Sequence, residues 1–543
     1  GDYHSCAVVA IAVGDSPSDQ SLKGQSTLKP TEPEDTRALQ PPEPPSAVQL
    51  KHPEILRKAL SAAFILSPAG LKGRGITKVV TPSNVEESLA ASPAVVFVLT
   101  AQDIRERGYT DLVEIFQDLP GIDLSITYGD SYLRSYWRGI RKGESSSFVF
   151  MVDGLILNHL WFNWTDIMTA VPLSSIERVE VVYGPATTVY GPNGMMGVIN
   201  VITQKNQDSD GAKGSARFSY GGFQTRVIDM SLGYQDKGFR VRATGFMNHG
   251  ELDLASLENY EWTSTKYLQD EDLWFDCLSN KDICGTPSSP RKNRALTLNI
   301  GFGDFELGAQ YFRVGDMYGT NYAFDRLQVQ GVWVEEDTVL YSRYRHVLND
   351  WLNSSTTMRY RESNVPNETN SVTRANDEVR FSNSQSLNNS WSAEQTFDLT
   401  PSSTVSLKLG FKYDMRYLQK DIDQTTGTSL DFNDEMTDNF FPNPPSDTYQ
   451  SQNRVTWTAR SFFLQGSIDP GEFIPWEKNP IHVGYRYDIN TFFDKLSDDA
   501  GDTIGGDHNF RLGYVANIGP FNAKLLWGTA SLQPTGRQLY GGR

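Results

Sequence analysis

The sequence predicts a mostly β protein: a transmembrane, antiparallel up-and-down β-barrel that follows a smaller α+β domain. From residue 207 onward, segments of about ten residues alternate apolar with polar side chains. In residues 404–415, for example, Val405, Leu407 and Leu409 fall on one face, and polar or small residues fall on the other. Because successive side chains of a strand point to opposite faces, this period of two predicts about 13 strands with one apolar face each.

The connections between these strands supply the second observation. From the second strand onward, short connections such as 235–238 and 303–304 alternate with long ones such as 249–292 and 313–335. Tight turns at one rim and long loops at the other are typical of an up-and-down membrane barrel. A β-sandwich has no reason to sort its connections in this way, so the pattern favours a barrel over a soluble β-protein.

Composition narrows the classes of protein further. The net charge of −17 argues against a nucleic-acid partner, which requires a basic face. The sequence has no run of 18 or more apolar residues, so it predicts no transmembrane helix. A mean hydropathy of −0.43 combined with 12% aromatic residues fits a barrel with aromatic girdles and a wet lumen, although a large soluble β-protein would share it.

The first 75 residues predict a disordered, Pro-rich extension, because they lack the apolar content to bury a core. Within this extension, residues 56–73 place Arg57 and Lys58 before an apolar run that small residues follow. That order is typical of a secretory signal. A short amphipathic helix is the alternative for the same segment.

The three cysteines are Cys6, Cys277 and Cys284. The last two lie close together in a polar stretch, where they predict a local disulfide in an oxidising compartment; two reduced surface cysteines are the alternative. No Cys or His spacing indicates a zinc site, so we expect neither a metal nor a cofactor.

Residues 76–206 predict a compact domain of mixed secondary structure. Apolar residues at helical spacing predict a helix in 101–122, which Pro120 and Gly121 end. Short runs rich in β-branched residues predict the strands that follow it. The stretch 178–203 holds four glycines and two prolines between two such runs, which indicates either tight turns in a confined space or ordinary surface turns.

Four motifs occur in order between residues 93 and 203: PAVVFVLTAQDIRERGYTDLVEIFQDLPGIDL, WRGI, VFMVDG and PLSSIERVEVVYGPATTVYGPNGMMGVINVIT. Together they resemble the plug domain of TonB-dependent outer-membrane receptors. The stretch WGTASLQPTGRQLYG at 527–541 resembles a barrel strand and loop of the same family. The sequence departs from the family pattern at Tyr183, Met196 and Gln533, which puts details of the plug–barrel contacts in doubt.

The resemblance implies a barrel of the 22-strand class with the α+β plug in its lumen, in the outer membrane of a Gram-negative bacterium and surrounded by its lipid. Residues 76–206 would hold the TonB-contacting segment and the plug, and residues 207–543 the barrel. Thirteen strands is an odd number, whereas bacterial barrels of this kind close with an even number of strands. The diameter of a barrel grows with the number of its strands, and a plug of this size needs the diameter of the 22-strand class. We therefore expect a C-terminally truncated barrel that lacks about nine strands.

The resemblance also implies energised import driven by TonB, the partner in the inner-membrane complex. TonB would bind an extended segment by strand addition. The candidates are Ile76, Thr77, Lys78, Val79, Val80 and Thr81; a plain linker or first strand is the alternative. The expected ligand is a small molecule, first a ferric siderophore, with cobalamin, haem, another metal chelate or a carbohydrate as alternatives.

Two sets of plug residues are candidates for contacts. Aromatic side chains could stack on a planar or catecholate-like ligand or pack against the barrel wall instead; they are Tyr128, Tyr132, Trp161, Phe162 and Trp164. Charged side chains could pair with a polar barrel wall; they are Arg138, Glu177, Arg178 and Glu180. His159 lies near Trp161 and predicts a structural histidine in preference to a metal ligand.

Other functions find little support. The sequence has no nucleophile elbow, zinc motif or paired acids in a shared context, so it does not predict an enzyme. A signal transducer would need a folded N-terminal domain, for which the Pro-rich start of the chain is a poor candidate. A purely structural or adhesive barrel would need neither a plug nor a TonB-contacting segment.

Overall fold

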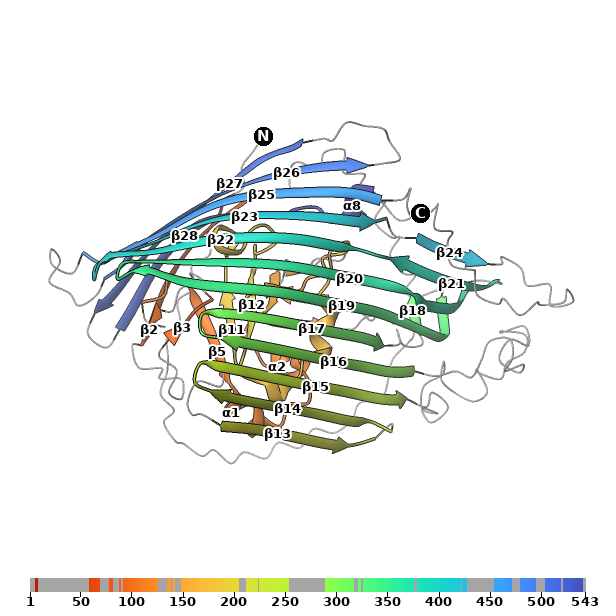
Figure 1. Cartoon of the computed structure of the whole chain (residues 1–543). Helices are drawn as coiled ribbons and strands as arrows, with labels where there is room; N and C mark the ends of the chain where they lie inside the picture. The colour runs from red at the N-terminus through yellow and green to blue at the C-terminus, as the bar shows by residue number, and fades with distance from the viewer. Residues whose placement is uncertain are drawn as a thin grey trace, which may run out of the picture.

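In the computed structural model, a large curved β-sheet wraps around a smaller α+β domain (Figure 1). Among the described residues, no helix is both long and apolar enough to cross a membrane. The structure describes residues 5–7, 58–68, 78–81, 87–88, 91–125, 134–137, 140–141, 148–204, 211–222, 224–252, 289–316, 321–323, 326–375, 378–420, 422–426, 454–470, 479–494, 503–518 and 521–540.

Thirteen strands of the large sheet correspond to the alternating segments of the sequence. Each pairs antiparallel with the next of the series, which is the up-and-down order that the connections predict. They are β13 (Gly211–Tyr220), β14 (Arg226–Asp236), β15 (Phe239–Leu252), β16 (Ser289–Phe302), β17 (Phe305–Asp316), β19 (Arg326–Asn349), β20 (Leu352–Ala375), β22 (Asn389–Ser402), β23 (Val405–Gln419), β25 (Arg454–Ile468), β26 (Ile481–Asp494), β27 (Thr503–Ile518) and β28 (Phe521–Ser531).

Shorter strands extend this sheet. Three of them, β18 (Asn321–Ala323), β21 (Glu378–Ser386) and β24 (Ile422–Thr426), lie on the side of the long connections. Strand β2 (Lys58–Pro68) pairs antiparallel with β28, and β1 (Ser5–Ala7) pairs parallel with β2. The structure therefore describes strands within the range that the sequence predicts as disordered, and residues 58–68 of the segment predicted as a signal or an amphipathic helix form β2.

The two faces of the sheet confirm the alternating pattern. On β23, Phe411 and Tyr413 are exposed on the outer face, while Lys408 and Asp414 are buried on the face toward the domain inside. Lys408 pairs with Asp398 on the neighbouring strand at 3.0 Å. An apolar outside and a polar inside are the arrangement that a barrel in lipid requires.

The domain inside the sheet, hereafter the plug, has strands at the predicted runs 122–125, 148–152, 176–183 and 197–203, and further short strands beside them. Its five-stranded sheet has the order β10-β9-β12-β11-β5, in which only β9 and β12 are parallel. The strands of the plug are β3 (Lys78–Val79), β4 (Glu87–Ser88), β5 (Val95–Thr100), β6 (Ile122–Ser125), β7 (Arg134–Trp137), β8 (Ile140–Arg141), β9 (Phe148–Val152), β10 (Leu155–Ile156), β11 (Ile176–Tyr183) and β12 (Gly197–Thr203).

The helices of the plug are short. The predicted helix in 101–122 is in fact two, α1 (Ala101–Arg107) and α2 (Leu112–Gln117). Gly108 ends α1 with φ at +75°, and the Asp111 side chain caps α2, so the backbone turns between them. The other helices among the described residues are η1 (Asp166–Ala170), η2 (Leu173–Ser175), α3 (Thr187–Tyr190) and, beyond the last strand, α8 (Gly536–Tyr540).

The glycine-rich stretch 178–203 doubles back inside the lumen as a β11–α3–β12 unit. Gly184 and Gly191 have φ values of +100° and +88°, which a side chain would strain. Asn193 also has a positive φ, and its N–H donates to the Ser531 carbonyl of β28 at 3.1 Å. The turns therefore serve the confined geometry, because the loop they form docks directly on the barrel wall.

Candidate functional site

The segment of residues 78–81 lies against the plug sheet and is held there by three side chains. The N–H groups of Val80 and Thr81 donate to the Glu180 carboxylate at 3.0 and 2.8 Å. The Asn200 amide donates to the Thr81 hydroxyl at 3.1 Å, and the Tyr190 hydroxyl donates to the Thr81 carbonyl at 2.8 Å. Thr81 is fully buried by these contacts.

This arrangement places the described part of the predicted TonB-contacting segment on the plug. Lys78 and Val79 form β3, which pairs with β4, so the alternative of a first strand describes their present conformation. Ile76 and Thr77 lie outside the described residues. The segment makes only a two-residue pairing within its own sheet, and its polar contacts run chiefly to single side chains of β11, α3 and β12.

The charged residues predicted to contact the barrel are paired within the plug instead. Arg178 donates from Nε to Glu180 at 2.8 Å, and its Nη1 pairs with Glu177. Strand β11 has partners on both sides, β5 and β12, so Glu180 faces the segment 78–81 on one surface of the plug sheet. Arg138, the fourth candidate, lies outside the described residues.

Barrel side chains that donate to plug carbonyls make many of the contacts between the two parts. Arg361 on β20 is the most buried of them, with 1% of its surface exposed. Its guanidinium donates to the carbonyls of Leu157 and Asn158 at 2.9 Å each, and it pairs with Asp337 of β19 through two bonds of 2.5 and 2.7 Å. Further donors to plug carbonyls are Arg343, Arg359, Arg486, Arg511 and Lys524.

The alternation of apolar and polar side chains along each barrel strand is enough to predict that these basic residues face the lumen. Sequence reasoning missed them because it looked for partners among the charges of the plug, whereas the plug supplies backbone carbonyls. Every residue type has a backbone carbonyl, so the sequence does not indicate which carbonyl accepts a hydrogen bond from the barrel, and only the tertiary structure identifies it.

The aromatic cluster at the plug apex packs against the barrel wall. Phe162 and Trp164 stack with ring centroids 4.0 Å apart, and both meet Trp333 of β19 edge-on. Trp161 and Phe162 are fully buried, and Gly536 of α8 lies directly on the Trp161 ring. In this conformation Trp161 and Phe162 offer no surface to a ligand and Trp164 offers 7% of its own, which supports the packing alternative; their contact with a ligand stays a prediction. Tyr128 and Tyr132 lie outside the described residues.

His159 organises the backbone of this apex. Its Nδ1 accepts hydrogen bonds from the N–H groups of Trp161 and Phe162 at 3.2 Å each. Burial, and to a lesser extent the nearby Arg361 guanidinium, lower the pKa of His159 to about 3. Within the described part of the chain, no group of three or more His, Cys, Asp or Glu side chains could hold a metal ion. The contacts of His159 are structural.

Acid should destabilise the apex through His159. The pKa of His159 is lower in the folded state than in the unfolded state. The contribution of its neutral imidazole to the free energy of unfolding is therefore complete above pH 6.5 and is lost as the pH falls from 6.5 toward 3. The slope is at most about 1.4 kcal/mol per pH unit. The Arg361 guanidinium adds to the penalty of a charged imidazole.

The measurement is thermal unfolding of the wild type and of His159→Asn between pH 7.5 and 4.5. The wild type should lose more stability than the variant across this range. Equal losses would contradict the prediction, because carboxylates that titrate in both proteins cancel in the difference.

The Glu180 contacts can be tested by amide hydrogen exchange. In Glu180→Ala the N–H groups of Val80 and Thr81 lose their acceptor, so their exchange should quicken by roughly tenfold or more, as expected for a charged hydrogen bond. Glu177→Gln is the matched control, since Glu177 makes no contact with the segment 78–81 among the described residues. Unchanged protection in Glu180→Ala would show that other contacts hold the segment.

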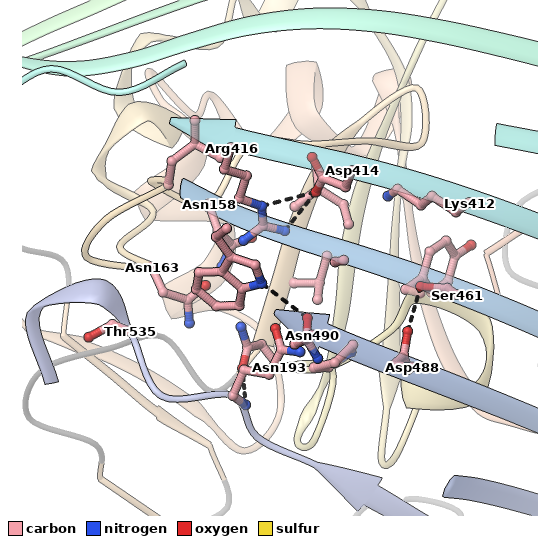
Figure 2. Close-up of a pocket in the computed structure, with 18 of the residues that line it drawn as sticks. Asn158, Asn163, Asn193, Lys412, Asp414, Arg416, Ser461, Asp488, Asn490 and Thr535 are labelled. Atoms are coloured by element: carbon pink, nitrogen blue, oxygen red, sulfur yellow. Dashed lines mark hydrogen bonds and ion pairs between the residues drawn. The ribbon is translucent and has the colours of Figure 1, made fainter. Parts of the chain in front are cut away.

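Two cavities lie between the plug and the barrel wall. The first, the upper cavity, has a volume of about 90 Å³ and lies on the side of the long connections; polar and charged side chains line most of it, as Figure 2 shows. The second, the lower cavity, has a volume of about 830 Å³ and lies toward the short connections. Both are bounded by the plug on one side and by β20 and β23 on the other.

A sheet with an apolar outer face, wrapped around a folded plug with polar cavities between them, defines a plugged outer-membrane barrel. Residues 88–198 match the family model of the TonB-dependent receptor plug domain. Residues 88–198 therefore form a plug domain of that family, and with the barrel strands that follow the chain is similar to TonB-dependent receptors of the Gram-negative outer membrane.

Relatives and solved structures agree with this assignment. The chain is 28% identical over 281 residues to the vitamin B12 transporter BtuB of Vibrio vulnificus. The aligned region covers 46% of this chain and 44% of that protein. Its fold resembles the ferric preacinetobactin receptor BauA of Acinetobacter baumannii, with 13% identity and a TM-score of 0.57 over 83% of this chain and 65% of BauA. It also resembles the ferric-catecholate import receptor Fiu of E. coli K12, with 14% identity and a TM-score of 0.55 over 82% of this chain and 71% of Fiu. The chain therefore spans less than half the length of the vitamin B12 transporter.

Proposed function

We propose that this chain forms part of an active importer that takes up a metal chelate across the outer membrane with energy delivered through TonB. The observation that carries the proposal is the segment 78–81, which a few polar side chains hold on the plug sheet. A pull on this segment would act directly on β11, α3 and β12, the elements that the Glu180, Tyr190 and Asn200 side chains belong to.

TonB would bind residues 76–81 by strand addition, which requires that the segment leave the plug. The backbone N–H groups of Val80 and Thr81 that now donate to Glu180 would then be free to pair with the partner strand. Exchange of one set of hydrogen bonds for another keeps the release reversible, because no buried backbone group is left without a partner.

For the ligand we propose a metal chelate, with cobalamin and a ferric siderophore as the two candidates. The relationship to a vitamin B12 transporter supports the first. The ferric-siderophore receptors share the fold at low identity, so they support the family more strongly than they support the second ligand. The aromatic cluster of Trp161, Phe162 and Trp164 does not choose between them, because it is packed against the wall.

Deletion of residues 76–81 tests the proposal. Cells that carry the deletion should still bind the chelate at the surface but should lose its TonB-dependent uptake, as measured with radiolabelled cyanocobalamin and with a radioiron-loaded siderophore. Wild-type uptake of the first alone identifies a cobalamin importer, and uptake of the second alone identifies a siderophore importer. Uptake that survives the deletion would overturn the proposed role of the segment, and loss of surface binding would indicate a folding defect instead.

A further inference from the structure

The upper and lower cavities share part of their lining, and this shared part is hereafter called the constriction. Four residues line both of them: Ile156 and Tyr190 from the plug, and Arg359 and Lys412 from the barrel wall. The lower cavity has the size of a small-molecule site, whereas the upper one has room for a few water molecules or one small polar group. The two basic side chains therefore lie where the two cavities adjoin.

The charges around the upper cavity do not balance. Five basic side chains line it, and three of them form ion pairs: Arg361 with Asp337, Arg416 with Asp414 at 2.8 Å, and Arg486 with Asp488 at 2.8 Å. The two that remain are Arg359 and Lys412. Arg359 and Lys412 thus have no ion pair among the described residues, although Asp414 attracts both and Glu394 attracts Lys412 from the neighbouring strand. His159 adds no charge, because its low pKa keeps it neutral.

Arg359 carries one of the uncompensated charges. It lies on β20 with 8% of its surface exposed, and within the described part of the chain its guanidinium makes a single hydrogen bond, to the Ile156 carbonyl at 3.2 Å. The Nε atom is buried without a partner, and the described residues offer no carboxylate within ion-pair distance. A guanidinium has five N–H donors, so most of the hydrogen-bonding capacity of this side chain is unused.

Lys412 carries the other. Among the residues that the structure describes, its ammonium makes no hydrogen bond or ion pair, and Figure 2 shows it with no interaction drawn to it. The acids nearest in strand register are Asp414, which Arg416 already engages, and Glu394, which lies opposite Lys412 on β22 but outside ion-pair distance. Glu394 lines only the lower cavity.

The strand register brings the two basic side chains to the same part of the wall. Arg359 lies opposite Ser392 of β22, and Ser392 lies opposite Asp414 of β23, two residues from Lys412 on the same face. Long side chains from these positions can reach a common group, since neighbouring strands lie about 4.8 Å apart. Because a buried cation without a partner is unfavourable, the constriction is chemically suited to an anion.

We propose that Arg359 and Lys412 form an anion-binding site at the constriction, which takes a carboxylate or phosphate group. Such a group can accept several hydrogen bonds from Arg359 and one from Lys412, and it neutralises the excess charge. Its source is either a free anion or an anionic group of the transported chelate; the second case rests on the proposed import function. The Tyr190 hydroxyl holds the plug side of the constriction through Thr81, so a pull on the segment 78–81 would act at the same place.

The site can be tested on the purified full chain in detergent by titration calorimetry with inorganic phosphate and with citrate at constant ionic strength. The wild type should show saturable binding of at least one of the two, and Arg359→Gln/Lys412→Met should bind it at least tenfold more weakly. Arg226→Gln/Lys213→Met is the matched control, because both residues are exposed on neighbouring strands and neither lines a cavity described above; its affinity should equal that of the wild type. Thermal unfolding verifies that each variant is folded, and the single variants replace the double one if it is not.

The absence of saturable binding in the wild type, or equal affinity in the double variant, would overturn the proposal. Uptake measurements separate the two sources of the anion. Slower chelate uptake by the double variant, with unchanged surface binding, identifies the group as part of the chelate; unchanged uptake identifies a free anion. The titration requires neither TonB nor the chelate, so it tests anion binding whether or not the proposed import function is correct.

Discussion

Replacement of Arg361 by Met should detach the plug apex from the barrel wall. The side chain is almost fully buried, pairs with Asp337 through two bonds and donates to three consecutive carbonyls of the plug, those of Ile156, Leu157 and Asn158. Methionine fills a similar volume but leaves Asp337 as a buried charge without its guanidinium. Removal of one partner from a buried pair typically costs about 3–5 kcal/mol.

Two measurements follow the effect of Arg361→Met: the temperature of thermal unfolding, and the rate at which a protease cleaves the plug in the folded protein. We expect a lower unfolding temperature and faster cleavage near residues 156–164. Asp337→Asn combined with Arg361→Met should recover part of the loss, because the double variant no longer buries an isolated carboxylate.

Arg359→Met provides a matched control on the same strand and the same face. Arg359 is buried to a similar degree but makes one hydrogen bond and no ion pair among the described residues. Its replacement should therefore leave the unfolding temperature unchanged or raise it. If the two variants lost stability equally, burial alone, and not the pairing with Asp337 and the plug, would account for the role of Arg361.

A side chain at Gly197 should prevent the plug sheet from forming. Gly197 begins β12 with φ at +155°, and a Cβ at this position would lie 2.1 Å from the Val182 carbonyl oxygen and 2.5 Å from the Trp137 ring. The first of these atoms belongs to the paired strand β11, so it cannot move without loss of the strand pairing. Backbone strain and overpacking together should lower the free energy of unfolding of the Gly197→Ala plug by about 3 kcal/mol or more.

The expected result for Gly197→Ala is a barrel that still enters the membrane with a plug that a protease degrades. Gly245→Ala is the control, because a Cβ on that barrel glycine would meet nothing within 4 Å and the position has an ordinary φ. A Gly197→Ala plug as resistant to protease as the wild type would show that the β11–β12 pair can shift to admit a methyl group.

The alternation of side chains and the order of the connections predicted the barrel strands closely. Both signals are local: the Leu407–Leu409 pattern arises within one strand, and a short connection such as 303–304 joins neighbours. The glycine-rich stretch 178–203 also predicted its turns, since a positive φ at Gly184 or Gly191 is a property of one residue. The motifs between residues 93 and 203 predicted the family, which the plug family match confirms.

The partners of the site residues could not be predicted in the same way. Glu180 looked like a barrel contact but binds the backbone of Val80 and Thr81, about 100 residues earlier in the chain. Trp161 and Phe162 looked like ligand-stacking residues, yet wall residues and α8 bury them. The residue type states what a side chain can do, and its neighbours decide which of those interactions it makes.

By itself, then, the sequence determined the strands, the turns and the class of this protein, because each depends on residues close together in the chain. Only the tertiary structure decided that Arg361 forms an ion pair while Arg359, two positions earlier, forms none with the residues that the structure describes. Both are arginines on the lumen face of β20, and nothing near them in the sequence separates them. The difference arises because Asp337 of β19, which lies opposite Ser363, forms an ion pair with Arg361 and not with Arg359. The fold, and not the local sequence, places β19 beside β20.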